Sequence, residues 1–128
     1  MSDTEAAGTE THAMTIFHNP SCSNSRTALG ILQERSVDHA VVEYLVTPPS
    51  RETLEMIISR LRDPVPDLIR RTDKRFLELG LDANAYTSAE EVISLLLVHP
   101  ELMQRPIVVK GDRAVIARPG DRVAEVLG

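Results

Sequence analysis

Polar and apolar positions in the first third of the chain predict a strand, a helix and a second strand. The β-rich run Thr15–Phe17 stops at the turn residues Asn19–Pro20, as a short strand would. Leucine and isoleucine then supply most of an apolar face over about Ser23–Arg35, which predicts a helix. A second apolar run, Ala40–Leu45, ends before two prolines and predicts the second strand.

The middle of the chain has the period of helices. Ser50 is a good N-cap for a helix whose apolar residues are spaced i, i+3, i+4 and i+7, namely Leu54, Ile57, Ile58 and Leu61. Pro64 and Pro66 break that pattern, and Asp67–Leu79 predicts one or two short helices closed by Gly80. The capping box Ser88–Glu91 opens a further helix that runs to about His99–Pro100.

The pattern then returns to strands. Ile107–Lys110 and Arg113–Ile116 flank Gly111–Asp112, a strong signal for an antiparallel hairpin with a two-residue turn. Asp121–Leu127 closes the chain as a predicted helix.

The predicted order is therefore βαβ, a block of helices, then ββα. This order favours an α/β thioredoxin-like fold with a mixed sheet, in which a helical insertion at about residues 50–102 enlarges the middle connection. A general α+β sandwich is the alternative. Residues 14–128 are predicted to form this single domain, whereas the small, polar and acidic segment Met1–Ala13 predicts a disordered leader.

Composition narrows the function classes. A length of 128 residues with 42% hydrophobic residues suits one globular domain, and a net charge of −5 argues against nucleic acid as a partner. The longest apolar stretches fall far short of the roughly 20 residues that span a membrane, and the N-terminus lacks the features of a signal peptide. We therefore expect a cytoplasmic protein with no membrane or nucleic-acid partner.

The charges are unevenly distributed. No acidic residue lies between Met14 and Gln33, and Asp112 is the only one between Leu102 and Gly120. Twelve of the fourteen basic residues are arginines, whose planar guanidinium groups bind oxyanions well. If the fold brings the two acid-poor stretches together, it creates an electropositive corner in an acidic protein.

The single cysteine, Cys22, follows the first predicted strand and opens the first predicted helix. Free N–H groups and the helix dipole stabilise an anion there, so we expect a lowered thiol pKa and a nucleophilic thiolate. Arg26, one turn later, can contact the thiolate or a bound oxyanion, and the side chains of Ser23 and Asn24 can hold its oxygens. A buried, inert core cysteine is the alternative, but the flanking residues are typical of loops and caps.

One cysteine per chain also limits the redox chemistry. Ser25 stands where a Cys-x-x-Cys motif would have its second thiol, so an external thiol has to complete any reduction that Cys22 starts. A metal site is not predicted, because the four histidines, His18 among them, are scattered.

Four collinear motifs resemble the glutaredoxin-dependent arsenate reductase family, often called the ArsC family, from about Met14 to the end of the chain. They are Phe17–Arg26, Tyr44–Arg51, Gln104–Val109 and Ala117–Pro119. The resemblance implies a thioredoxin-like fold with a helical insertion. Ser23–Asn24 depart from the Gly-Thr of the best-characterised members and are like the loop of a sister branch.

The resemblance also implies roles for individual residues. Cys22 matches the nucleophile that attacks arsenate, and His18 matches a residue thought to tune the thiol. The three arginines of the family's oxyanion site match Arg70, Arg105 and Arg118, with Arg71 as the alternative to Arg70. Arg105–Pro106 opens a predicted strand at the place where thioredoxin-like folds usually have a cis proline beside the active cysteine.

The expected activity is reduction of arsenate to arsenite, with glutathione as co-substrate, glutaredoxin as partner and no bound cofactor or metal. Two alternatives stay open: a monothiol, glutathione-dependent oxidoreductase of another substrate, and a redox-linked transcriptional regulator of the same fold. The arginines argue against the first alternative, because a site for glutathione alone has less need of them. Ser25 argues against the second, because that branch often carries Cys-x-x-Cys.

Overall fold

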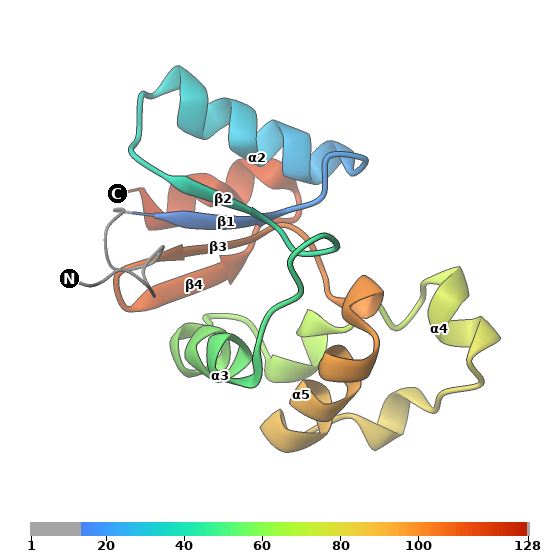
Figure 1. The fold of residues 1–128 in the computed structure, drawn as a ribbon. Helices are drawn as coiled ribbons and strands as arrows, with labels where there is room; N and C mark the ends of the chain where they lie inside the picture. Colours follow the sequence, from blue (N-terminus) through green and yellow to red (C-terminus); the bar gives the residue numbers. More distant parts are fainter. Residues whose placement is uncertain (1–13, 128) are drawn as a thin grey trace.

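The structure is a computed structural model that describes residues 14–127. Within these residues, four strands form one mixed sheet in the order β2-β1-β3-β4 (Figure 1). The predicted leader Met1–Ala13 and Gly128 lie outside the described residues. β1 (Thr15–His18) pairs in parallel with β2 (Ala40–Glu43), and antiparallel with β3 (Ile107–Lys110). β4 (Arg113–Ile116) completes the predicted hairpin on the other side of β3. The predicted mixed sheet is confirmed.

Strand residues alternate between two hydrophobic clusters, one on each face of the sheet. Ile16, Val108 and Val115 pack with α2 (Ser23–Glu34) and with the 3₁₀ helix η4 (Gly120–Val126). Their sequence neighbours point to the opposite face, where the helices that join β2 to β3 cover them. This period of two follows from the pleat of a strand, and both faces of the sheet are buried as a result.

The connection between β2 and β3 is helical, as its apolar spacing predicts. The Ser50 side chain accepts a hydrogen bond from the Thr53 N–H at the start of the first helix, and the Ser88–Glu91 capping box is present at the start of the longest later one. The predicted caps are therefore correct. In chain order the segments are α3 (Arg51–Arg60), η1 (Val65–Leu68), α4 (Lys74–Glu78), η2 (Ala83–Ala85), α5 (Ala89–Val98) and η3 (Pro100–Leu102).

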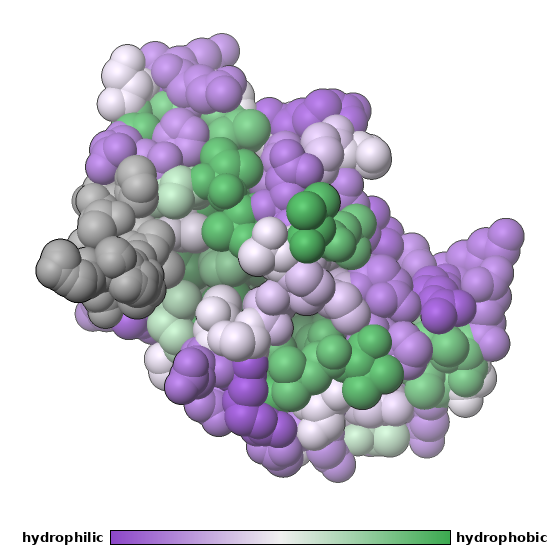
Figure 2. Space-filling model, in the orientation of Figure 1, coloured by the Kyte–Doolittle hydropathy of each residue, from purple (hydrophilic) through white to green (hydrophobic). Residues whose placement is uncertain are grey.

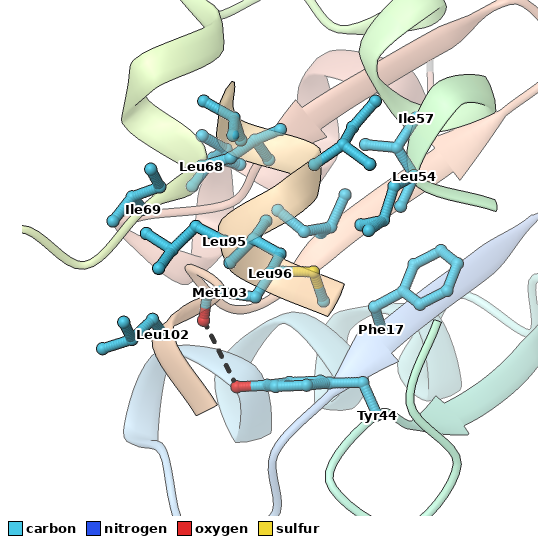
Figure 3. Packing of buried hydrophobic residues seen from close by; sticks show 14 of the residues in the cluster. Phe17, Tyr44, Leu54, Ile57, Leu68, Ile69, Leu95, Leu96, Leu102 and Met103 are labelled. Atoms are coloured by element: carbon cyan, nitrogen blue, oxygen red, sulfur yellow. Dashed lines mark hydrogen bonds between the residues drawn. The ribbon is translucent and has the colours of Figure 1, made fainter. Parts of the chain in front are cut away.

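Tyr44 joins the sheet to this helical part of the core (Figure 3). Its ring is fully buried, and its hydroxyl donates to the Met103 carbonyl oxygen at 3.4 Å. Leu54 and Ile57 of α3 and Leu96 of α5 fill the same cluster. Tyr44, the residue after β2, is thus held by Met103 in the segment that leads into β3.

Some elements differ from the sequence prediction. β2 ends two residues early because the N–H groups of Val46 and Thr47 both donate to the Glu43 carbonyl and form a turn. The closing helix is a 3₁₀ helix that starts one residue early, at Gly120. The short helices η2 and η3 carry too few residues to show an apolar period, and the sequence did not predict them.

Some apolar side chains remain on the surface. Leu45 and Val46, in the turn after β2, are 49% and 77% exposed, and Figure 2 shows apolar side chains gathered over this turn and over part of the helical connection. No helix within residues 14–127 has the length and apolar character needed to cross a membrane.

Candidate active site

Cys22 is the N-cap residue of α2, directly after the loop that follows β1. The loop is closed by its own polar groups. Asn19 Oδ1 accepts from the Ser21 N–H at 2.9 Å, Ser25 Oγ accepts from the Asn19 N–H at 3.3 Å, and the Cys22 N–H donates to the Asn19 carbonyl at 3.0 Å. These bonds hold the thiol over the first turn of the helix, whose N–H groups have no partner within the helix.

The thiol is activated by hydrogen bonds that outweigh its partial burial. Burial raises the pKa of Cys22, but the backbone N–H of Ser25, the Arg105 side chain, the backbone N–H of Asn24 and the Arg118 side chain lower that pKa to about 7. A large share of the sulfur is therefore thiolate near neutral pH, and the thiolate is the nucleophilic form.

The Arg118 side chain contacts the Cys22 sulfur directly. Its Nη1 lies 3.6 Å from Cys22 Sγ and donates to the Arg105 carbonyl oxygen at 2.9 Å. Arg105 and Arg118 each precede a cis proline, and the Ala117 N–H donates to the Pro106 carbonyl at 2.9 Å. The start of β3 and the end of β4 thus bring both arginines to the thiol, and the two acid-poor stretches do meet here.

Arg70 comes from the helical connection. Its N–H donates to the Leu102 carbonyl at 2.8 Å, and Ile69 and Met103 form an antiparallel bridge, so this segment runs beside the residues that lead to Arg105. Burial, followed by the nearby charge of Arg105, lowers the pKa of the Arg70 guanidinium, whereas Asp73 at 2.8 Å raises it. Arg70 is therefore electrostatically part of the cluster, although it shares its charge with Asp73.

Arg71, the alternative to Arg70, has a different environment. Its Nη2 pairs with Asp67 at 3.0 Å, and its side chain is 38% exposed, against 22% for Arg70. Arg71 and Arg118 both line a pocket of about 270 Å³ between the helical connection and the end of β4. The charges of Arg105 and Arg118 lower the pKa of the Arg70 guanidinium.

The side chains of the candidates in the first turn of α2 have contacts that the sequence did not indicate. The Asn24 side chain accepts from the Gly120 N–H at 3.1 Å, so it is its backbone N–H, and not its side-chain oxygen, that faces Cys22. Arg26 Nη1 donates to the Pro20 carbonyl at 3.0 Å, on the loop that precedes Cys22. Ser23 is exposed at the first position of α2.

His18 lies at the end of β1 and is only 5% exposed. Burial lowers its pKa; Glu43 raises that pKa and the Arg26 charge lowers it further. Its Nδ1 has no hydrogen-bond partner among the described residues. Arg105 and Arg118 lower the pKa of Cys22, so the structure brings two of the three arginines into the electrostatics of the thiol.

Two further residues belong to the site. The Ser25 N–H is the largest contribution that lowers the pKa of Cys22, but any residue type would supply that backbone group, so no sequence signal marks it. Burial raises the pKa of Tyr44, whereas the charge of Arg105 and hydrogen bonds with Asn19 and Arg105 lower it. Tyr44 thus packs against the arginine beside the thiol.

Among residues 14–127, no group of three or more His, Cys, Asp or Glu side chains is arranged to hold a metal ion. The site consists of one activated thiol and a cluster of guanidinium groups at a helix N-terminus. Such a cluster can bind a small oxyanion and place it against the nucleophile.

Comparison with known families matches residues 17–126 to the ArsC family. The chain belongs to the ArsC family. The match covers the end of β1, all of β2, β3 and β4, the helical connection and every candidate residue of the site, so the resemblance noted from the four motifs is confirmed.

Named relatives cover nearly the same span. The chain is 39% identical over 113 residues to an arsenate reductase of Neisseria meningitidis serogroup B, which spans 88% of this chain and 96% of the relative. It is 36% identical over 114 residues to an arsenate reductase of Escherichia coli, with 89% and 80% covered. It is also 39% identical over 119 residues to the uncharacterized protein YfgD of Escherichia coli K12, with 92% and 99% covered.

Solved structures agree on the fold. An arsenate reductase from Vibrio cholerae superposes with a TM-score of 0.79 at 33% identity, covering 90% of this chain and 98% of that one. The predicted α/β thioredoxin-like fold of the ArsC type is thereby confirmed.

Proposed function

We propose that this protein reduces arsenate to arsenite, with the Cys22 thiolate as the nucleophile. The observation that carries the proposal is the contact of Arg118 with Cys22 Sγ at 3.6 Å, in a site where the thiol pKa is lowered to about 7. The chain's relatives that are named arsenate reductases support it.

Electrostatics favour an oxyanion substrate. Arsenate and a thiolate are both negative near neutral pH, so their approach is repelled unless fixed cations lie between them. Arg118 donates to the sulfur, the Arg105 side chain also lowers the thiol pKa, and the charges of both arginines lower the pKa of Arg70. Preorganised donors of this kind lower a barrier by about 2 to 4 kcal/mol each. Ser23, Asn24 and Arg26 are proposed to contribute at the helix N-terminus, and His18 to support the loop that carries the thiol.

The proposed reaction balances over two steps. The Cys22 thiolate displaces one arsenate oxygen, which leaves as water after protonation, and forms a sulfur–arsenic(V) bond. The thiolate of glutathione then attacks Cys22 Sγ, the sulfur–arsenic bond breaks, and its electron pair stays on arsenic, which departs as arsenite. Arsenic gains two electrons, and the two thiols are oxidised to a Cys22–glutathione mixed disulfide.

An external protein thiol completes the cycle. The chain has one cysteine, so it cannot form an internal disulfide. We propose that glutaredoxin attacks the glutathione sulfur of the mixed disulfide and restores the Cys22 thiolate. No cofactor is proposed to stay bound, and the reducing cytoplasm is the proposed compartment, because glutathione is kept reduced there.

A coupled assay tests the proposal. NADPH oxidation is followed with glutathione, glutathione reductase and glutaredoxin present, with and without arsenate, for the wild type and Cys22→Ser. The expected result is arsenate-dependent oxidation in the wild type and background oxidation in the variant. If the wild type reduces a glutathione mixed disulfide but shows no arsenate dependence, the monothiol oxidoreductase replaces this proposal.

A further inference from the structure

Ile116, the last residue of β4, has both backbone groups bound by one ion pair. Its N–H donates to Asp63 Oδ2 at 2.9 Å, and its carbonyl accepts from Arg122 Nη1 at 2.9 Å. The same Nη1 lies 3.0 Å from Asp63 Oδ1. We call Asp63 and Arg122 the bracket, because they hold Ile116 from both sides.

The bracket lies where β4 has no neighbouring strand. β4 is an edge strand, and Leu61 pairs with Ala114 along its free edge, where the Arg62 N–H donates to the Ala114 carbonyl at 2.9 Å. Asp63 continues this contact through its side chain. Pro64 follows, and a proline has no N–H to donate. The Asp63 side chain is 14% exposed, so its carboxylate is shielded from most of the solvent.

A short chain of hydrogen bonds connects the bracket to the thiol. The Ile116 carbonyl also accepts from the Arg118 N–H at 2.9 Å. The Arg118 side chain in turn donates to the Arg105 carbonyl and contacts Cys22 Sγ. Arg122 and the Arg118 N–H therefore bind the same group, the Ile116 carbonyl.

On the side that faces the pocket, no packed side chains among the described residues hold the Ile116–Arg118 segment in addition to these hydrogen bonds. The pocket beside Arg118 is lined by both bracket residues and by Ile116, so solvent-accessible space and not a packed core adjoins this segment. Hydrogen bonds between fixed partners are then what keep the segment in one position.

We propose that Asp63 and Arg122 are positioning residues that hold Arg118 against Cys22 Sγ. The inference rests on the proposed function only in taking Arg118 as a ligand of arsenate; the effect on the thiol does not depend on the substrate. Without Asp63, the Ile116 N–H loses its acceptor. Arg122 keeps its two bonds to Glu125, at 3.0 Å each, but its Nη1 loses the carboxylate that fixes it beside the Ile116 carbonyl. Arg118 then loses its fixed position.

The test compares Asp63→Ala, Asp63→Asn, Arg118→Ala and the double variant Asp63→Ala/Arg118→Ala. The pH midpoint of Cys22 alkylation by iodoacetamide measures the pKa of the thiol, and kcat/KM for arsenate measures catalytic efficiency. Glu90→Ala is the matched control, because it removes a carboxylate that binds Arg51 with two hydrogen bonds, at 2.9 and 3.0 Å, far along the chain from this site.

Asp63→Ala is expected to raise the alkylation midpoint toward that of Arg118→Ala and to lower kcat/KM on the order of tenfold, as a displaced catalytic group does. Asp63→Asn keeps an oxygen for the Ile116 N–H, so its alkylation midpoint and kcat/KM are expected to lie between those of Asp63→Ala and the wild type. The double variant is expected to match Arg118→Ala alone, because coupled residues are not additive. Glu90→Ala is expected to leave the midpoint unchanged.

A variant of Asp63 that unfolds more easily but keeps the wild-type alkylation midpoint would overturn the proposal, and so would additive effects in the double variant. If Asp63→Ala does not fold, the alkylation midpoints of Asp63→Asn and Arg122→Gln test the proposal in its place. A wild type without arsenate turnover would remove the proposed function, while the alkylation midpoints would still decide whether the bracket positions Arg118.

Discussion

Nη1 of Arg118 lies 3.6 Å from Sγ of Cys22, although 96 positions separate the two residues in the chain. The contact joins the end of β4 to the start of α2 and gives the thiolate a cationic hydrogen-bond donor. Because this donor is fixed before a substrate binds, we expect it to stabilise developing negative charge without a reorganisation cost.

Removing this guanidinium should therefore impair catalysis far more than stability. Arg118→Ala is expected to lower kcat for arsenate by about 10²- to 10³-fold, the usual loss for one preorganised donor. Arg60→Ala is the control, since Arg60 Nη1 also donates to a backbone carbonyl, that of Gly111 at 2.9 Å. Equal losses in the two variants would contradict the role given to Arg118.

The lowered pKa of Cys22 also predicts a pH dependence of stability. The thiol pKa is about 7 in the folded protein and near 9 in the unfolded chain, so the folded state releases its proton first. The free energy of unfolding should therefore rise from pH 7 to pH 9 and lose this contribution as the pH falls through 7.

Cys22→Ser isolates that contribution. Urea unfolding of the wild type and the variant, in the presence of a phosphine reductant, should give a difference in stability that shifts in favour of the wild type between pH 7 and pH 9. The same difference at both pH values would show that the folded-state pKa is not lowered.

Gly120 allows η4 to lie close against α2. A Cβ at this position would lie 2.5 Å from the Asn24 carbonyl oxygen and 2.8 Å from Thr27 Cβ. Gly120→Ala is therefore expected to lower the free energy of unfolding by about 1 to 3 kcal/mol, as overpacking does. Chemical denaturation measures the change, and Gly30→Ala, where an added Cβ meets nothing within 4 Å, is the control. A Gly120→Ala variant no less stable than Gly30→Ala would rule out the close approach.

The capping box of α5 should matter for stability and not for chemistry. Ser88 Oγ accepts from the Glu91 N–H at 3.2 Å, and the Glu91 carboxylate accepts from the Ser88 N–H at 3.0 Å. Ser88→Ala is expected to cost about 1 kcal/mol in thermal or urea unfolding. Its kcat for arsenate should stay at the wild-type value, and a large loss would place α5 closer to the reaction than its position indicates.

Local signals explain how much of the fold could be predicted. The N-caps Ser50 and Ser88 and the Gly111–Asp112 turn act through neighbours in sequence, and the structure has all three. Gly111 has a φ of 59°, which suits its place in the two-residue hairpin turn. The position of Cys22 at a helix N-terminus likewise followed from the turn and cap residues around it.

Contacts between distant segments could not be predicted in the same way. Asn24 has the side chain of an anion ligand, but Gly120, far along the chain, uses its oxygen. Asp63 and Arg122 carry no motif, and their role depends on where β4 ends. The sequence predicted which residue types gather at the thiol, whereas their hydrogen-bond partners depended on the packing of η4 and of the helical connection.

The role of Cys22 as nucleophile is tested most directly by the intact mass of the protein after incubation with arsenate and glutathione, without glutaredoxin. We expect one glutathionyl group on Cys22, formed only when arsenate is present and absent from Cys22→Ser. A wild-type protein that acquires no glutathionyl group, or acquires it equally without arsenate, would contradict the claim that Cys22 is the nucleophile of arsenate reduction.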